Sequence, residues 1–365
     1  MTKLQQLYAD HRQSPWLDNL TREHLRGGEL RRLIAAGIRG VTSNPTLFAN
    51  AINGSAAYDD QFRNLIRTGG TVTDAYWEMV IDDIDAALTQ LRPVYDQSAG
   101  GDGFVSVELA PDLARHTERS IDEARRLHER INEPNLFVKI PATPAGVPAV
   151  RKMIGEGRSI NITLLFSLER YKEVIESYLA GLEAYAGDLA PVHSVASFFV
   201  SCVDTEVDQR LEAIGTGEAL ELRGRAALAQ AKLAYQLFRS RFSGSRWEAL
   251  AARGARVQRP LWASTSTKNP AYPDTTYVDG LIGPDTINTL PEATIVAFED
   301  HGTVAATIES DVNDAQRTLD RLEAIGVSMT DVGRTLEDEG VASFTKSFDD
   351  LLATLEAKRA ALCAS

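Results

Sequence analysis

The chain has 365 residues, of which 44% are hydrophobic and 24% charged, so it is long enough for a large core or several domains. Its formal net charge of -13 argues against nucleic acid and anionic membrane surfaces as partners of the whole molecule. Two cysteines cannot form a disulfide framework, the N-terminus has no apolar signal core, and the longest apolar run is too short to cross a bilayer. We therefore expect a cytoplasmic protein.

Strand-like runs alternate with helix-like runs along almost the whole chain, which is typical of a parallel sheet in an α/β protein. We expect eight strands, at residues 15–18, 37–43, 103–109, 135–143, 159–166, 192–199, 260–265 and 277–282. Eight strands with helices between them predict a (β/α)8 TIM barrel. The alternative is a doubly wound open sheet, but no Gly-x-Gly-x-x-Gly turn follows the first strand.

Additional helices are expected between and after the strands, and Thr21 and Ser167 are candidate N-caps of two of them. The expected ranges are 21–36, 46–68 with a break at 53–54, 73–91, 111–131, 148–154, 168–185, 204–241 with a break at 215–217, 291–300, 312–325 and 330–361. No internal repeat or linker marks a domain boundary. We therefore predict a single barrel domain over residues 1–365, with residues 300–365 as a C-terminal helical extension packed on it.

One lysine lies inside an apolar strand-like run. Lys139 follows Leu136, Phe137 and Val138, and the run stops at Pro141. At the C-terminal end of a buried strand, partial removal from water disfavours the ammonium form. A neutral amine is what a carbonyl substrate needs to form a Schiff base. The alternative is an ordinary strand-end lysine whose head reaches solvent.

Polar side chains gather where the predicted strands end, and a barrel carries its chemistry at those ends. The set contains one amine, two carboxylates, and hydroxyl and amide groups, from Asp18, Ser43, Asn44, Glu108, Lys139, Asn161, Thr163, Ser197, Ser266 and Lys268. These groups suit Schiff-base formation and proton transfer on a polyhydroxylated carbonyl compound. The six histidines are scattered without metal-ligand spacing, so we expect no metal site.

Several of these residues lie in motifs of a known family. The motifs are, in chain order, Trp16-Leu17-Asp18, Gly40-Val41-Thr42-Ser43-Asn44-Pro45-Thr46, Val105-Ser106-Val107-Glu108, Phe137-Val138-Lys139-Ile140-Pro141-Ala142-Thr143, Ile160-Asn161-Ile162-Thr163-Leu164-Leu165-Phe166-Ser167, Val195-Ala196-Ser197-Phe198-Phe199, and Trp262-Ala263-Ser264-Thr265 with Lys268-Asn269-Pro270. With these motifs, from about residue 14 to 300, the sequence resembles the transaldolases. These are Schiff-base enzymes of the non-oxidative pentose phosphate pathway.

The resemblance implies a reaction that needs no metal or organic cofactor. A dihydroxyacetone unit would move from sedoheptulose 7-phosphate or fructose 6-phosphate to glyceraldehyde 3-phosphate or erythrose 4-phosphate. Lys139 would form the Schiff base, and Asp18 would take and return the proton of carbon–carbon cleavage. Glu108 and Thr163 would hold a catalytic water. Sugar phosphates are thus the expected small-molecule partners, and a homo-oligomer is left open.

The resemblance also implies a substrate-binding set. Asn44, Asn161 and Ser197 would bind the hydroxyls of the dihydroxyacetone unit and Phe199 would wall the pocket, with Ser43, Ser266 and Lys268 completing the set. Structural alternatives exist for several of these residues. Asn44 could be a turn residue before Pro45, Asn161 and Ser197 could be satisfied core polar groups, and Asp18 could begin a helix cap.

The sequence departs from the family pattern after the sixth strand. The family usually has an arginine there that helps to hold the substrate phosphate, whereas this chain has Cys202, which supplies neither charge nor a bidentate fork. Lys268 remains as a phosphate contact, and Arg210 is expected to be a surface group. Two alternative functions follow: an enzyme with an altered donor or acceptor, or a catalytically silent barrel that binds sugar phosphates.

Overall fold

The computed structural model describes the backbone of residues 1–364 and the side chains of residues 1–362. Eight parallel strands close into a barrel in chain order, with β8 pairing back to β1. The strands are β1 (Ser14–Asp18), β2 (Gly40–Thr42), β3 (Phe104–Glu108), β4 (Leu136–Pro141), β5 (Ile160–Leu165), β6 (Ser194–Phe199), β7 (Arg259–Ala263) and β8 (Ile287–Leu290). The predicted (β/α)8 barrel is therefore confirmed.

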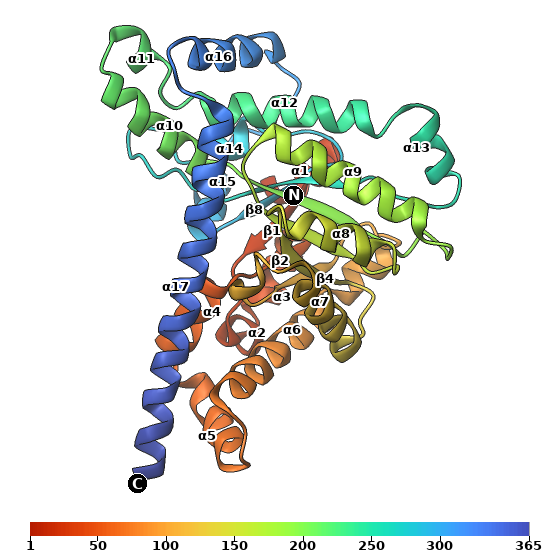
Figure 1. Ribbon diagram of the computed structural model, residues 1–365, viewed down its shortest axis with the longest axis vertical. Coiled ribbons are helices and arrows are strands. Elements are labelled where there is room, and N and C mark those ends of the chain that lie inside the picture. Colours follow the sequence, from red (N-terminus) through yellow and green to blue (C-terminus); the bar gives the residue numbers. More distant parts are fainter. Residues whose placement is uncertain (365) are drawn as a thin grey trace.

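Helices surround the barrel (Figure 1). They are α1 (Lys3–His11), α2 (Arg22–Gly27), α3 (Glu29–Ala36), α4 (Pro45–Gly54), η1 (Ala56–Tyr58), α5 (Asp59–Arg67), α6 (Val72–Gln97), η2 (Pro111–Leu113), α7 (Thr117–Ile131), α8 (Gly146–Ile154), α9 (Leu168–Ala184), α10 (Ser201–Ile214), α11 (Gly217–Glu221), α12 (Ala226–Arg241), α13 (Gly244–Ala251), α14 (Thr276–Asp279), α15 (Glu292–His301), α16 (Val312–Ala324) and α17 (Met329–Ala364). Ser365, the last residue of the expected C-terminal extension, and the side chain of Cys363 lie outside the described residues.

The eighth strand was predicted at the wrong place. Residues 277–282 are apolar enough for a strand, but they contain the short helix α14 and the turn after it. Thr275 begins this turn, because its hydroxyl donates to the Asp279 carboxylate at 2.7 Å and its carbonyl accepts from the Val278 N–H at 2.9 Å. The real strand β8 begins at Ile287, after Thr286, and carries two polar residues that weaken its apolar pattern.

Local signals explain where several helices begin and break. The Thr21 and Ser167 hydroxyls accept from backbone N–H groups three residues on, so both predicted N-caps are confirmed. The helix predicted at 21–36 divides into α2 and α3 at Gly28, which adopts the left-handed φ of 83°. Gly40 in β2 is required for a different reason. A Cβ atom there would lie 2.4 Å from the Trp16 indole, which fills the inside of the barrel.

The strand register brings the polar residues of neighbouring strands together. Lys139 on β4 lies beside Glu108 on β3 and Asn161 on β5. A register shift between β5 and β6 coincides with Leu164, whose φ of 53° is left-handed. Such irregularities redirect neighbouring side chains. Here Thr163 lines an interior cavity, while Leu164 contacts α17 beside Gly340.

The long helix α17 runs along one side of the molecule toward the C-terminus (Figure 1). It contacts α4, α5, α6 and α10 and also approaches β5. Arg210, expected as a surface group, is partly exposed and also links α10 to α17: its guanidinium donates to Asp331 at 2.8 Å and to Thr335 at 3.1 Å. None of the helices within residues 1–364 combines the length and apolarity that spanning a membrane requires.

Candidate active site

Lys139 is buried at the C-terminal end of the barrel. Its side chain is 5% exposed, and its Nζ lies 2.8 Å from Oε2 of Glu108, which is equally buried. The amine also donates to the backbone carbonyl of Ser43 at 3.0 Å. The alternative of a strand-end lysine reaching solvent is therefore wrong for this residue.

Two effects shift the pKa of the Glu108 carboxyl in opposite directions. Burial raises the pKa of its carboxyl above the usual value of 4.5, and the neighbouring Lys139 partly offsets this by favouring the carboxylate. A raised pKa lets a carboxyl group hold a proton transiently near neutral pH. Thr163 lies close by at the end of β5, and its buried hydroxyl makes no hydrogen bond to any described residue. That hydroxyl lines the same cavity as Lys139 and is free to contact a small molecule or water.

Asp18 provides the second carboxyl group, at the last position of β1. Burial raises its pKa above the usual 3.8, against the opposing effects of the Lys139 charge and of a hydrogen bond from Thr42. The Thr42 hydroxyl donates to Oδ1 of Asp18 at 2.9 Å. Asp18 and Lys139 line one cavity, so two carboxyl groups with raised pKa values flank the amine.

A chain of polar groups lies beside the lysine. The Ser197 hydroxyl donates to Oδ1 of Asn161 at 2.7 Å, and Nδ2 of Asn161 donates to the Ser106 hydroxyl at 3.0 Å. These contacts fix the orientation of the Asn161 amide and leave its second N–H unused. Asn44 caps α4, since its side-chain oxygen accepts from the Leu47 N–H at 2.9 Å, and it also lines the cavity. Capping and substrate contact are therefore compatible at this position.

The cavity above Lys139 is small, about 160 Å³. Typical ligand pockets measure roughly 300–1,000 Å³, so this volume suits a few-carbon unit better than a whole sugar phosphate. Most of the predicted site residues line it: Asp18, Asn44, Lys139, Thr163, Ser197, Phe199, Ser266 and Lys268. The remaining three, Ser43, Glu108 and Asn161, contact members of that set.

Lys268 and Ser266 follow β7 and lie near the mouth of the cavity. Lys268 is exposed and donates to the Ser266 hydroxyl at 3.3 Å. Cys202 is half-buried in the first turn of α10, with its Sγ 3.7 Å from the hydroxyl of Ser264, which also lines the cavity. Position 202 is therefore beside the mouth, where an arginine side chain could reach an anionic substrate.

Sequence reasoning missed Phe344 as a site residue. It lies on α17, more than 60 residues after the last strand-end residue of the predicted set, yet it lines the same cavity as Asp18 and Lys139. Close packing of Gly340 against Leu164 and a hydrogen bond from Thr46 to Ser347 (2.9 Å) hold this part of α17 in place. The sequence predicts the helix at 330–361 correctly, but it does not predict that this helix contacts the site.

A buried lysine paired with a carboxylate, at the C-terminal end of a (β/α)8 barrel, is an arrangement suited to reactions of carbonyl compounds. Comparison with known proteins shows the family of the chain. The chain belongs to the family described as transaldolase/fructose-6-phosphate aldolase, whose sequence model matches residues 15–355.

Relatives with close sequence similarity carry the same family name. The chain is 52% identical over 354 residues to a transaldolase of Thermobifida fusca, a match that covers 96% of each chain. It is 50% identical over 345 residues to a transaldolase of Parafrankia sp., covering 93% of this chain and 94% of that one. A protein named transaldolase 1 of Streptomyces avermitilis is 49% identical over 349 residues, covering 94% and 92%.

Proposed function

We propose that this protein is a class I transaldolase, a transferase that carries a dihydroxyacetone unit on Lys139. The observation that carries the proposal is the buried Lys139–Glu108 pair, which shares one cavity with the Asp18 carboxyl. Family membership and the names of the relatives support the same activity. The donor is sedoheptulose 7-phosphate or fructose 6-phosphate, and the acceptor is glyceraldehyde 3-phosphate or erythrose 4-phosphate.

The first half of the reaction attaches the donor. The Lys139 amine, after passing a proton to Glu108, attacks the C2 carbonyl of the ketose, and water leaves from the carbinolamine to give the iminium. Glu108, with its raised pKa, exchanges the protons of this step, and the free Thr163 hydroxyl helps to hold the water that carries them. Asn161, Ser197 and Asn44 bind the hydroxyls of the dihydroxyacetone end, while Phe199 closes one wall.

The second half moves the carbon unit. Asp18 takes the proton of the C4 hydroxyl, the C3–C4 bond breaks, and its electron pair passes to the iminium to form an enamine on Lys139. The shortened aldose leaves through the mouth near Lys268. The enamine carbon then attacks the acceptor aldehyde, and Asp18 returns its proton to the new hydroxyl. Water releases the longer ketose from Lys139.

Borohydride trapping tests the covalent carrier. With fructose 6-phosphate and borohydride, wild type should gain one reduced dihydroxyacetone unit on the peptide containing Lys139. Lys139→Met should lose this labelling, while Lys268→Met serves as the matched control because it removes the other lysine of the same cavity and should still be labelled. Labelling that persists in Lys139→Met, or wild type that is never labelled, contradicts the proposal.

A second candidate function rests on position 202. Cys202 lies beside the mouth through its contact with Ser264, where it supplies no positive charge. This favours an enzyme with the same chemistry but weaker dependence on a donor phosphate. A panel of phosphorylated and free ketoses distinguishes the two functions by their relative kcat/KM values. A silent sugar-phosphate-binding barrel is disfavoured by the buried lysine–carboxylate pair, which is costly to keep without a use.

A further inference from the structure

A second cavity lies at the opposite, N-terminal end of the barrel. It measures about 550 Å³, within the usual range for small-molecule sites and larger than the cavity above Lys139. Its lining comes from α1, from the segment before β3, from residues 255–257, and from inward-facing strand residues. None of the residues in the proposed reaction lines it. The cavity is therefore separate in space from the site of the proposed reaction.

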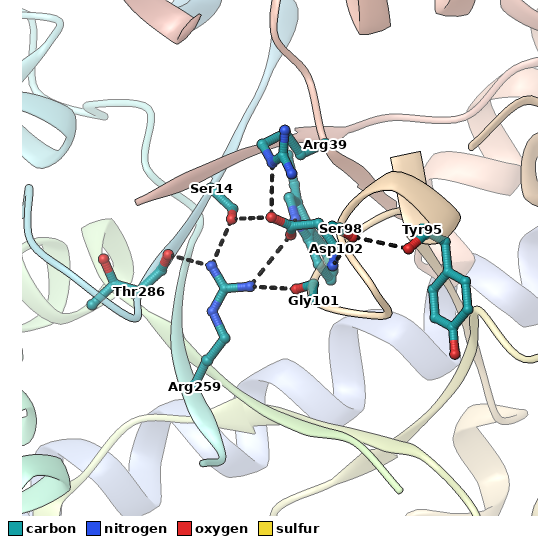
Figure 2. Close-up of polar contacts among 9 residues, drawn as sticks. Ser14, Arg39, Tyr95, Ser98, Gly101, Asp102, Arg259 and Thr286 are labelled. Atoms are coloured by element: carbon teal, nitrogen blue, oxygen red, sulfur yellow. Dashed lines mark hydrogen bonds and ion pairs between the residues drawn. The ribbon is translucent and has the colours of Figure 1, made fainter. Parts of the chain in front are cut away.

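A buried carboxylate organises one wall of this cavity (Figure 2). Asp102 accepts hydrogen bonds from Ser14 (2.5 Å), from Arg39 (2.8 Å) and from the Trp16 indole (3.1 Å), and pairs with Arg259 at 3.3 Å. Figure 2 shows Arg259 reaching between the loop at Gly101 and the start of β8, where it also donates to Ser14 and Thr286. These bonds satisfy both Asp102 oxygens and hold the wall rigid.

Positive charge exceeds negative charge around this cavity. Arg12, Arg256 and Arg259 line it and Arg39 joins through Asp102, against only two carboxylates, Asp102 and Asp285. The Arg12 side chain forms no hydrogen bond or ion pair with any described residue, and its guanidinium lies 5.6 Å from the centre of the Tyr8 ring. Arg256 donates one bond, to the Ala99 carbonyl at 2.6 Å, and keeps its other N–H groups free. Two guanidinium groups are thus available to an anion.

His193 adds an unpartnered polar group. Its side chain is 93% buried and lines the cavity, with its ring against Phe104 at 5.0 Å between centroids. Neither ring nitrogen has a hydrogen-bond partner within residues 1–362, so the neutral ring keeps one N–H donor unused. Burial and the positive Arg256 and Arg259 lower the pKa of His193 to about 3, so the imidazole is neutral at physiological pH.

The inner walls are aromatic. Trp16, Phe104 and Phe137 close the inner end of the cavity but are at most 3% exposed, with Phe104 and Phe137 stacked at 4.4 Å between ring centroids, whereas the partly exposed Trp247 offers ring surface to a ligand. A ring-bearing ligand would bury its apolar face here, whereas a compact inorganic anion would leave these walls uncovered. The cavity combines aromatic walls with free guanidinium groups at its edge.

We propose that this cavity is a binding site for a small phosphate monoester that carries a planar ring. The phosphate lies between Arg12 and Arg256, whose planar forks match its oxygens and whose excess charge matches a dianion. The ring lies against Trp247 and accepts a hydrogen bond from His193 where it bears an acceptor. This is a site at the end of the barrel opposite to Lys139.

Titration calorimetry with phenyl phosphate tests the proposal. We expect saturable binding to wild type, with inorganic phosphate and phenol each binding at least tenfold more weakly, and a change in tryptophan emission because Trp16 and Trp247 line the cavity. The double variant R12Q/R256Q should lose at least tenfold in affinity. Arg31→Gln is the matched control, because Arg31 is an exposed arginine on α3 outside the cavity.

Several outcomes would overturn the site. One is no saturation at millimolar phenyl phosphate, and another is undiminished binding in R12Q/R256Q. Equal affinity for inorganic phosphate would contradict a ring-recognising site. Loss of binding in Lys139→Met would place the ligand at the catalytic end instead. Arg12→Gln alone breaks no hydrogen bond of the described structure, so its weaker binding remains informative if the double variant fails to fold.

Discussion

In the proposed reaction, Asp18 must ionise although its carboxyl group is buried. It must exist as a carboxylate to accept the proton of cleavage, yet burial raises its pKa and favours the neutral acid. Three features oppose that cost: the positive charge of Lys139, the hydrogen bond from Thr42 and the positive charge of Lys268. The Thr42 hydroxyl is therefore a positioning group whose effect should appear in the pH dependence of the reaction.

Thr42→Val should move the acid limb of the kcat profile to higher pH. A hydrogen bond to a charged group contributes roughly 1.5–3 kcal/mol, which corresponds to about one or two pH units. The measurement is kcat against pH with fructose 6-phosphate and glyceraldehyde 3-phosphate. Thr289→Val is the control, because Thr289 lines the same cavity but its hydroxyl donates to the Trp262 carbonyl. Identical acid limbs for Thr42→Val and wild type would remove Thr42 from this role.

Cys202→Arg should restore strong phosphate recognition. A charge-assisted hydrogen bond contributes about 1.5–3 kcal/mol, and an arginine fork can make two, so phosphate-dependent binding should improve by roughly 3 kcal/mol. The phosphate lies far from the bond that breaks, so the gain should appear in KM rather than kcat. We expect KM for fructose 6-phosphate to fall at least tenfold, with little change for free fructose.

Steady-state kinetics of wild type and Cys202→Arg on both sugars make this comparison. Should wild type already bind fructose 6-phosphate tightly and the substitution change nothing, another group replaces the arginine. Lys268 is the residue to remove next, since it is the lysine at the mouth of the cavity. Loss of phosphate preference in Lys268→Met would then identify the substitute.

The proposed catalytic residues could be selected from the sequence because each stands at or near a strand end within a short motif. Lys139 and Glu108 are adjacent in the β3–β4 register, which follows directly from parallel pairing of two predicted strands. The sequence places Thr42 in a family motif but does not predict its contact with Asp18. That contact joins β2 to the neighbouring strand β1, and no local residue pattern indicates it. Contacts between strands depend on register, which residue patterns fix only approximately.

At the scale of elements, α17 shows the limit of local reasoning most clearly. Its helical periodicity predicted a helix at 330–361, but not that the helix returns to the barrel mouth. The prediction of the eighth strand at 277–282 was wrong because a strand-like apolar pattern occurs in a segment that is not a strand. Tyr277, Val278, Leu281 and Ile282 are buried and apolar, as strand residues would be, but the hydrogen bonds of Thr275 place this segment in α14 and the turn after it. Tertiary packing decides both cases, because burial alone does not distinguish a short helix from a strand.

Phe344→Ala should increase hydrolysis of the covalent intermediate on Lys139 relative to transfer to the acceptor. Phe344 closes the cavity from the α17 side, and its removal would admit water to the enamine or iminium on Lys139. We expect dihydroxyacetone release without acceptor to rise several-fold relative to transfer, with a smaller change in donor KM. Release and transfer can be measured in parallel assays. Phe344→Leu is the matched control, because it keeps an apolar wall, and an unchanged ratio in Phe344→Ala would exclude Phe344 from this role.

At the scale of the whole molecule, different buried polar contacts lie at the two ends of the barrel. The catalytic end holds its carboxyl groups close to one amine, and the opposite end ties the beginnings of β1, β2, β3, β7 and β8 together through Asp102 and its arginines. Breaking a buried ion pair leaves an uncompensated charge and costs about 3–5 kcal/mol. Asp102 is therefore a stability residue rather than a reacting one.

Asp102→Asn should lower the free energy of unfolding by about 3 kcal/mol, because Arg39 and Arg259 lose their shared carboxylate. Chemical denaturation followed by circular dichroism measures the change. The control is Asp96→Asn, which removes an exposed partner of Arg92 in an i,i+4 pair and should cost well under 1 kcal/mol. Equal losses in the two variants would contradict the role of Asp102.

The same variant tests the domain organisation. We propose that residues 1–365 form a single barrel domain with residues 300–365 as a helical extension packed on it, supported by the contacts of α17 with α4, α6 and α10. In a single cooperative unit, damage at Asp102 lowers the protection of slowly exchanging amides everywhere, including residues 341–355 of α17, which lie far from Asp102 in the sequence. Hydrogen exchange of α17 in Asp102→Asn should therefore accelerate by the factor that matches the global loss of stability. If α17 keeps its wild-type protection while the strands lose theirs, the extension unfolds independently and the single-domain proposal is wrong.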